Sequence, residues 1–541
     1  MRRALLAFVA LALVVALPFV FRSAARATAA PTDGRSLETL VILTPHNESI
    51  RYEFGRAFHA HMARLGRDVE LDWRSPGGTG EIARYLASEY ASSFERHWTH
   101  DLGRRWSSAV AAGLARTGPL PATGGDEGDE ARRAFLASNV GSGVDLLFGG
   151  GPTDFIKHAS AGRLVDAGLI ARRPDLFGPG GIPQRRAGEI YWDEGGRWYG
   201  TELSSFGVCY NRDVLDRLGV AAPPTSWAEL AAPVFRGQLA LADPTKSASV
   251  GTAFEAIVQT EMNAALARAR AAGERDPAAL DRAARRDGWA AAVRLIRRIG
   301  ANARYFTDSG VKIPLDVSMG DAAAGMCIDF FGRFQGEYAA SVGRDGRVGF
   351  STARGETMLN ADPIALLRGA PHPDLAVGFI EFVLSEEGQR LWALRRGTPG
   401  GPERYTLHRL PILPRLYDAA LAPYRADPDE DPYAETDAFT YHAAWTGPIF
   451  SAIALVVRTM CVDPDEELRD AYGALAAAHF PPQATAAFDD VTLVDYDTVN
   501  GPLRAALQSA DPLEEARWSI RLVEHHRALY RRVAALARAG R

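Results

Sequence analysis

Polar and glycine-rich segments follow several short apolar runs of this chain, and their residue types suit the binding of an oxygen-rich ligand. The main segments are Thr44–Ser49, Ser75–Gly80, Gly149–Gly151 and Thr245–Ser249. Hydroxyl groups and the unpaired N–H groups at a helix start favour phosphate, carboxylate or another oxyanion. Glycine lets the backbone come close to such a group.

These segments, the crossing at Ser204 and the end of one strand supply the candidate site. The candidate ligand-binding residues are Thr44, His46, Asn47, Glu48, Gly77, Gly78, Thr79, Gly150, Gly151, Ser204, Ser205, Thr245, Lys246, Ser247, Ser249 and Asp329. The Asp329 carboxylate could accept sugar hydroxyls, bind an amine or pair with Arg333. Structural explanations stay open for the rest: helix capping, an ordinary βα turn, or an N-cap serine beside a solvated lysine.

The sequence contains no motif of an activated nucleophile. Gly-x-Ser-x-Gly, His-Glu-x-x-His and the Walker loop are all absent from the chain. His97 and His100 stand three residues apart, but no third metal ligand is evident, and the acidic run Asp427–Asp431 is interpreted as a solvated linker. We therefore expect no catalytic residue, no metal ligand and no cofactor. A secreted hydrolase is kept as an alternative from another class of protein.

Length and composition predict a folded protein of more than one core. The chain has 541 residues, of which 47% are hydrophobic and 23% charged, and a formal net charge of −5. A chain of this length is too long for a single hydrophobic core of ordinary size. Its negative net charge does not indicate a nucleic-acid-binding surface. Three cysteines (Cys209, Cys327 and Cys461) are too few for a disulfide framework or a zinc site. One disulfide is left open, and we interpret all three residues as buried.

The N-terminus indicates export. Arg2 and Arg3 precede an apolar run over Ala4–Phe21, and small residues around Ala27 and Ala29 fit a cleavage pattern. Residues 1–30 are therefore a signal peptide or an N-terminal anchor, and the protein is expected in the periplasm or outside the cell. Gly447–Val457 is apolar but too short to cross a bilayer, which predicts a core helix.

The positions of the apolar runs predict parallel α/β lobes. Thr39–Leu43 and Val69–Trp73 are strand-length runs, each followed by a polar loop and a helical pattern. Leu239–Ala242 and Gly325–Asp329 repeat the arrangement further along the chain. Loops at the carboxyl ends of such strands form ligand sites. Two lobes that face each other would be joined by two crossings of the chain, near Glu202–Phe206 and near Thr352–Asp362. Such lobes would close around a ligand by hinge motion.

The segment Tyr199–Val258 carries a family resemblance. The segment contains an extended run, then a proline turn, then a short strand that leads to Asp243-Pro244. In this order, the elements resemble the second lobe of bacterial solute-binding proteins of ABC importers. The branch is the iron(III)/sugar-phosphate/polyamine-like one, in family 1. The text Ala376–Gln389 resembles the same family, and five segments match in order between about residues 38 and 417.

The resemblance implies a fold, a domain organisation and a function. The fold would be α/β, a two-lobed type II periplasmic-binding-protein fold with a central cleft. The implied organisation is lobe 1 at 38–205 with a helical insert at about 88–135, lobe 2 at 206–352, a return to lobe 1 at 353–417 and a helical C-terminal extension at 418–541. A monomer would capture a small polar solute, anionic or phosphorylated, and deliver it to an ABC permease. A membrane-anchored ligand-sensing receptor of the same fold is the alternative.

Ferric-binding members of that family place adjacent tyrosines in the second lobe. The corresponding segment of this chain is Ile328-Asp329-Phe330-Phe331. Phenyl rings cannot ligate iron as phenolates do, so this mode of iron coordination is not expected. Phe330 and Phe331 would form a stacking wall or pack in the core.

Overall fold

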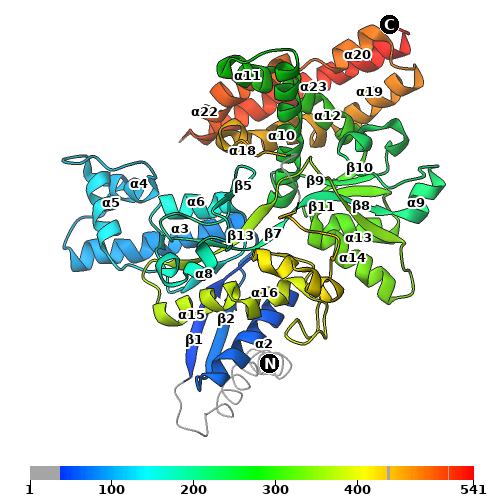
Figure 1. Cartoon of the computed structure of the whole chain (residues 1–541). Helices are drawn as coiled ribbons and strands as arrows, with labels where there is room; N and C mark the ends of the chain where they lie inside the picture. Colours follow the sequence, from blue (N-terminus) through cyan, green and yellow to red (C-terminus); the bar gives the residue numbers. More distant parts are fainter. Residues whose placement is uncertain (1–36, 435–438, 510) are drawn as a thin grey trace, which may run out of the picture.

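The computed structural model describes residues 37–434, 439–509 and 511–541 (Figure 1). The prediction of a signal peptide or anchor at residues 1–30 lies outside this range. Two main sheets with helices around them form two lobes, which we call lobe 1 and lobe 2.

The sheet of lobe 1 has seven strands in the order β14-β7-β13-β3-β1-β2, with β4 paired to β13. Its strands are β1 (Glu38–Leu43), β2 (Val69–Arg74), β3 (Leu146–Phe148), β4 (Leu164–Val165), β7 (Tyr199–Ser204), β13 (Asn360–Leu367) and β14 (Leu410–Pro411). β1 runs parallel to both β2 and β3, whereas β13 is antiparallel to β3 and β7. The carboxyl ends of β1 and β3 therefore share one edge with the start of β13.

The sheet of lobe 2 repeats this plan with five strands in the order β10-β9-β11-β8-β12. They are β8 (Phe206–Asn211), β9 (Leu239–Ala242), β10 (Ala303–Thr307), β11 (Ala324–Ile328) and β12 (Val348–Thr352), while β5 (Arg185–Arg186) and β6 (Glu189–Ile190) form a separate hairpin. In each sheet, three parallel strands are followed by an antiparallel strand that has just arrived from the other lobe: β13 in lobe 1 and β8 in lobe 2. The predicted two-lobed type II fold is confirmed.

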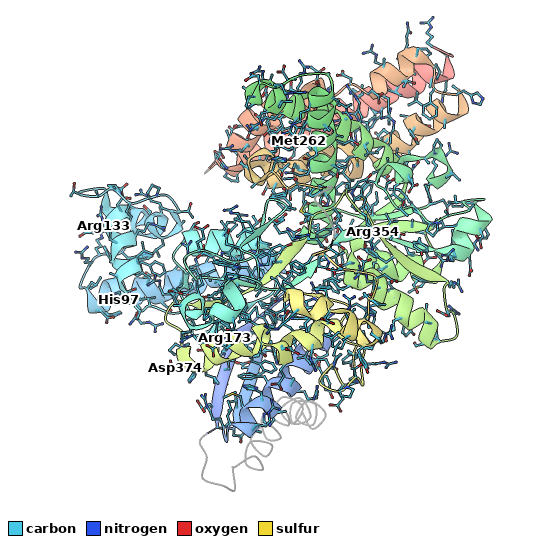
Figure 2. The ribbon with its side chains drawn as sticks, viewed as in Figure 1. His97, Arg133, Arg173, Met262, Arg354 and Asp374 are labelled. Atoms are coloured by element: carbon cyan, nitrogen blue, oxygen red, sulfur yellow. The ribbon has the colours of Figure 1, made fainter. Side chains whose placement is uncertain are left out.

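Helices cover both sheets and form the insert. In lobe 1 and its insert they are α2 (Glu48–Arg64), α3 (Thr79–Arg96), α4 (Ser108–Ala115), α5 (Glu127–Ala137), α6 (Pro152–Ser160), α7 (Leu169–Arg172), α8 (Pro174–Phe177), α15 (Pro373–Leu384) and α16 (Glu386–Ala393). Asp126 begins α5 with a capping box to Asp129. Figure 2 shows His97 and Arg133 on this insert, at the opposite side of the molecule from Arg354 between β12 and β13.

The remaining helices belong to lobe 2 and the extension. They are α9 (Arg212–Arg217), α10 (Ala248–Ala271), α11 (Pro277–Ala283), α12 (Trp289–Ala301), α13 (Lys312–Met319), α14 (Asp329–Ser341), α17 (Ala443–Thr446), α18 (Phe450–Val457), α19 (Asp465–Ala477), α20 (Pro482–Phe488), α21 (Tyr496–Thr498), α22 (Arg504–Leu507) and α23 (Pro512–Arg538). The extension helices pack beside α10 and α12 (Figure 1).

Lobe 2 and the C-terminal extension share one hydrophobic core. Buried residues of both regions form a single cluster. The Trp289 indole N–H donates to the Val494 carbonyl at 2.7 Å, and the Tyr472 hydroxyl donates to the Ala231 carbonyl at 2.9 Å. A Cβ added at Gly300 would lie 2.6 Å from the sulfur of Cys461, so α12 and the extension approach too closely for a side chain. The extension is thus built onto lobe 2.

The apolar run predicted as a core helix lies inside this cluster. Among the described residues, one helical run, Ala443–Val462, is long and apolar enough to cross a membrane, and 67% of its most apolar window is buried in the protein. The expectation that this run is too short to cross a bilayer is therefore wrong for the helical run as a whole, whereas its burial confirms the core helix. Cys209, Cys327 and Cys461 are free and buried, as predicted.

A buried charge network connects lobe 2 to the segment that follows α16. His408 contacts Glu337 of α14 through Nε2 at 3.1 Å and Asp427 through Nδ1 at 3.1 Å. Arg333 of α14 lies 3.7 Å from Asp427 and 3.4 Å from Glu430. We call these five residues the interlobe clamp. The interpretation of Asp427–Asp431 as a solvated linker is therefore wrong for Asp427, whose carboxylate pairs with side chains distant in sequence.

The clamp makes stability depend on pH. Burial lowers the pKa of His408, but its hydrogen bonds with Asp427 and Glu337 outweigh this effect and raise the pKa to about 9. Arg333 beside Asp427, and Arg396 at 3.7 Å from Glu337, keep these acids charged. Because the folded pKa exceeds the unfolded one, the stabilisation is complete below about pH 6.5 and is lost as pH rises through about 9.

We expect His408→Gln to lower the free energy of unfolding by roughly 3 kcal/mol at pH 6. The difference from the wild type should shrink as pH rises and nearly vanish at pH 10. Chemical denaturation at several pH values measures it, with His59→Gln on the exposed side of α2 as the matched control. A deficit of His408→Gln that does not change with pH would contradict this account.

The shared core gives a second stability prediction. Trp289 is 1% exposed, so Trp289→Ala should cost about 3–5 kcal/mol through lost burial and a cavity. Hydrogen exchange should speed up in residues 248–301 and in residues 439–537 together. Ile520→Ala, at a position 59% exposed on α23, is the control and should change stability by less than about 0.5 kcal/mol. Faster exchange confined to one of the two regions would refute a common core.

Candidate functional site

His46 lies directly after β1, at the edge of the lobe 1 sheet where β1 and β3 end. Its ring packs edge-on against Phe148, with 4.5 Å between ring centroids, and lies 6.0 Å from Trp392. The Thr44 hydroxyl oxygen accepts the His46 backbone N–H at 3.0 Å, which fixes the turn. His46 is 5% exposed, and neither ring nitrogen has a hydrogen-bond partner. Burial first, and then the nearby guanidinium groups, hold its pKa well below the usual range, so the imidazole is neutral.

The glycine-rich loops meet His46 and each other. A Cβ at Gly149 would lie 2.5 Å from Nε2 of His46, and one at Gly150 would lie 2.9 Å from the methyl group of Thr79. Both glycines have positive φ, +92° and +107°, a conformation that other residues rarely adopt. The loops after β1, β2 and β3 therefore converge on one place in lobe 1.

Two helices begin at this place. α3 starts from Gly78 and α6 from Gly151, and neither has a side chain that caps its first turn. The first-turn N–H groups of α3 are available to a ligand and attract negative charge. In α6, by contrast, Pro152 has no N–H, and the Asp154 N–H donates to the Gly151 carbonyl at 3.2 Å. Asp154 of α6 shares a hydrogen bond with Thr79, and burial raises its pKa against the pull of Lys157 and that bond. The lobe 1 face thus offers several donors and one carboxyl group.

Other predicted residues of lobe 1 have structural roles. Asn47 caps α2, with its side-chain oxygen accepting the Ile50 N–H at 3.2 Å. Glu48 is exposed and pairs with Arg51 at 3.1 Å. Gly77 is exposed, and a Cβ there would lie 2.8 Å from the side chain of Glu81. Helix capping, the alternative given for Asn47 and Glu48, accounts for both without a ligand.

In lobe 2 the predicted loop begins α10. Ser247 is the N-cap but makes no capping bond, and its hydroxyl lies 3.4 Å from that of Ser249. Thr245 is already engaged, because its hydroxyl donates to Asp243 at 2.7 Å, and the side chain of Lys246 is exposed. Ser247 and Ser249 are therefore the groups of this loop that remain for a ligand.

The predicted residues at the crossing are brought together from both lobes. The Asp329 carboxylate accepts the Ser205 N–H at 3.0 Å and the Ser205 hydroxyl at 3.1 Å, and it is fully buried. It also lies 3.9 Å from Arg333, the pairing left open above. Burial raises the pKa of Asp329, opposed by Arg333. With its oxygens engaged by protein donors, Asp329 joins α14 to the first crossing.

Sequence reasoning missed three charged residues on or next to the strands that join the lobes. Nη1 of Arg409 donates to the Ser204 hydroxyl oxygen at 2.6 Å and lies 3.1 Å from Glu202 and 3.0 Å from Asp362. Burial first, and then Asp362, raise the pKa of Glu202 well above its ordinary range. The sequence around them contains no clear signal, because Glu202 follows Thr201 and Arg409 follows His408, so neither charge interrupts an apolar run.

Phe330 covers this group from lobe 2. The guanidinium carbon of Arg409 lies 3.5 Å from the centroid of the Phe330 ring, a cation–π contact. The rings of Phe330 and Phe331 are 4.1 Å apart. Phe330 therefore packs in the core against a side chain of the chain itself, the second of the two alternatives given for it. One atom each of His46, Glu202 and Asp362 lie within 4.8 Å of one another, a set that could hold a metal ion.

Comparison with known proteins agrees with this architecture. Residues 149–406 match the family model described as bacterial extracellular solute-binding protein. A protein of Haemophilus influenzae, named only as uncharacterised, is 24% identical over 189 residues, 35% of this chain and 45% of its own. The match thus spans less than half the length of that relative.

Solved structures of periplasmic binding proteins are also similar. AfuA of Actinobacillus pleuropneumoniae, bound to fructose 6-phosphate, is 17% identical, with 66% of this chain and 81% of that chain covered and a TM-score of 0.41. Iron-bound HitA of Pseudomonas aeruginosa is 16% identical, with 78% and 99% covered and a TM-score of 0.46.

The family model includes both crossings, all of lobe 2 and the return into lobe 1. Residues 149–406 are thus similar to the bacterial extracellular solute-binding proteins, and this is the resemblance inferred from the sequence.

Proposed function

We propose that this protein is the extracytoplasmic substrate-binding component of an ABC importer, which captures a small polar solute between its lobes and delivers it to a membrane permease. The observation that carries the proposal is His46. A buried imidazole with two unpartnered nitrogens is costly unless a ligand hydrogen-bonds to it. It lies where the three loops of lobe 1 meet.

The groups around His46 favour a hydroxylated solute that carries an anionic group. The N-terminus of α3 provides N–H donors for an oxyanion. Asp154 can accept a hydroxyl hydrogen bond, which a purely anionic ligand could not supply. Ser247 and Ser249 would add contacts from lobe 2 when the cleft closes. Contacts that form only in the closed state favour closure.

The family consists of binding proteins, and we propose the same for this chain rather than an enzyme. No nucleophile or catalytic base is needed to explain the geometry around His46. The export expected from the N-terminal sequence fits a periplasmic receptor. A membrane-anchored ligand-sensing receptor with the same fold is the second candidate, favoured by the apolar run at Ala4–Phe21. Mass spectrometry of the mature N-terminus separates the two, since a start near Ala30 means release.

The proposal predicts that a polar solute stabilises the folded protein and is recovered unchanged. Native mass spectrometry of protein purified from the periplasm should show a co-purifying small molecule. A thermal-shift comparison of fructose 6-phosphate, inorganic phosphate and fructose tests the ligand class. An anionic probe at about 100 times its Kd should add roughly 2.7 kcal/mol of stability. If only chemically altered probe is recovered, the protein is an enzyme and the proposal fails.

His46 should be needed for ligand binding. His46→Ala removes a buried hydrogen-bonding group and should weaken the affinity for the bound solute roughly 10- to 100-fold. Isothermal titration calorimetry with the solute found by mass spectrometry measures the change. His59→Ala, on the exposed face of the adjacent helix α2, is the matched control and should leave the affinity unaltered. Equal affinities of the wild type and His46→Ala would place the ligand elsewhere.

A further inference from the structure

The strands that join the two lobes hold a set of side chains that could bind a divalent metal ion. His46 follows β1, Glu202 lies on β7 and Asp362 lies on β13, where the pairing register sets Glu202 directly beside Asp362. One ligand atom from each of the three lies within 4.8 Å of the others. Neutral imidazole and carboxylates are ligands of Zn²⁺ and Mn²⁺. The unpartnered nitrogens of His46 are free for coordination.

The guanidinium group of Arg409 already provides a positive charge beside the two carboxylates of this set. Arg409 lies 3.0 Å from Asp362 and 3.1 Å from Glu202, and it is 4% exposed. Its charge is permanent, because a guanidinium is not deprotonated in proteins. A divalent ion bound to the same carboxylates would lie within a few ångströms of Arg409, and the repulsion between them would be strong at this depth.

The position of Arg409 is fixed from both lobes. Leu410, the next residue, pairs with Leu203 of β7, which holds Arg409 beside Ser204. Phe330 of lobe 2 covers the guanidinium at 3.5 Å. The side chain cannot swing away without breaking its bond to Ser204 and leaving two buried acids without a counter-charge.

We infer that Arg409 determines ligand specificity. Its positive charge excludes metal ions from the His46–Glu202–Asp362 set, so the ligand of this site is an organic solute. The inference rests on the proposed function only in naming an organic solute as the ligand. Metal titration of solute-free protein tests it whether or not a solute is found.

The test measures Zn²⁺ and Mn²⁺ binding by the full chain, by calorimetry and by electron paramagnetic resonance. The wild type should bind neither ion at this site with a Kd below about 1 mM. Arg409→Gln should bind one ion about 100-fold more tightly or better, since the repulsion is removed. The double variant Arg409→Gln/His46→Ala should lose at least about 10-fold of that increase in affinity.

Arg409→Lys is the matched control, because it keeps a positive charge and loses the planar fork. It should exclude metal as the wild type does. Three results would overturn the inference: one-to-one metal binding by the wild type that His46→Ala abolishes, equal metal affinities of the Gln and Lys variants, or an Arg409→Gln affinity that does not depend on His46. If Arg409→Gln is unfolded in chelator, Zn²⁺ should restore its far-UV circular dichroism, and failure to restore it would also overturn the inference.

Discussion

Two carboxylates on adjacent strands dominate the energetics where the lobes join. The register of β7 and β13 sets Glu202 beside Asp362, and both strands carry the chain between the lobes. The buried Glu202 beside the partly buried Asp362 is tolerable only if one of the two is protonated or a cation is shared between them. The structure uses both means: the pKa of Glu202 is raised, and Arg409 contacts each carboxylate. The return of the chain to β14 is what delivers that arginine.

The same principle explains how the extension is attached. Arg297 of α12 is fully buried, and its guanidinium donates to the carbonyls of Phe488 and Asp490 in the extension. A buried guanidinium needs acceptors, so α12 cannot keep its place without them. Together with the common hydrophobic cluster, this ties the extension to lobe 2. Any hinge motion would therefore carry the extension along with lobe 2, while the interlobe clamp limits how far α14 can move from the segment at His408.

Much of the fold could be predicted from the sequence, because its signals are local. A continuous apolar run such as Leu239–Ala242 identifies a buried strand, and the polar loop after it marks the start of a helix. The convergence of the loops at His46, Thr79 and Gly150 follows from parallel strands that end at one edge. The partners of Glu202 and Arg409 could not be predicted, because these residues lie about 200 positions apart and meet only through the order of strands. The interpretation of Asp427 as part of a solvated linker is wrong for the same reason. Its neighbours in sequence are polar, and its partner His408 comes from another segment.

The two sides of the cleft differ in how ready they are for a ligand, and the difference bears on the order of events. On lobe 1, Gly149 leaves no room for movement against His46, and Phe148 and Trp392 hold the ring from other directions. Ligand binding there would require little ordering of side chains, so less of the interaction energy is lost. On lobe 2, Ser247 and Ser249 are partly exposed and can rotate. If the proposed function holds, the solute is therefore held first by lobe 1, and hydrogen bonds from the start of α10 then supply the difference in affinity that closes the cleft.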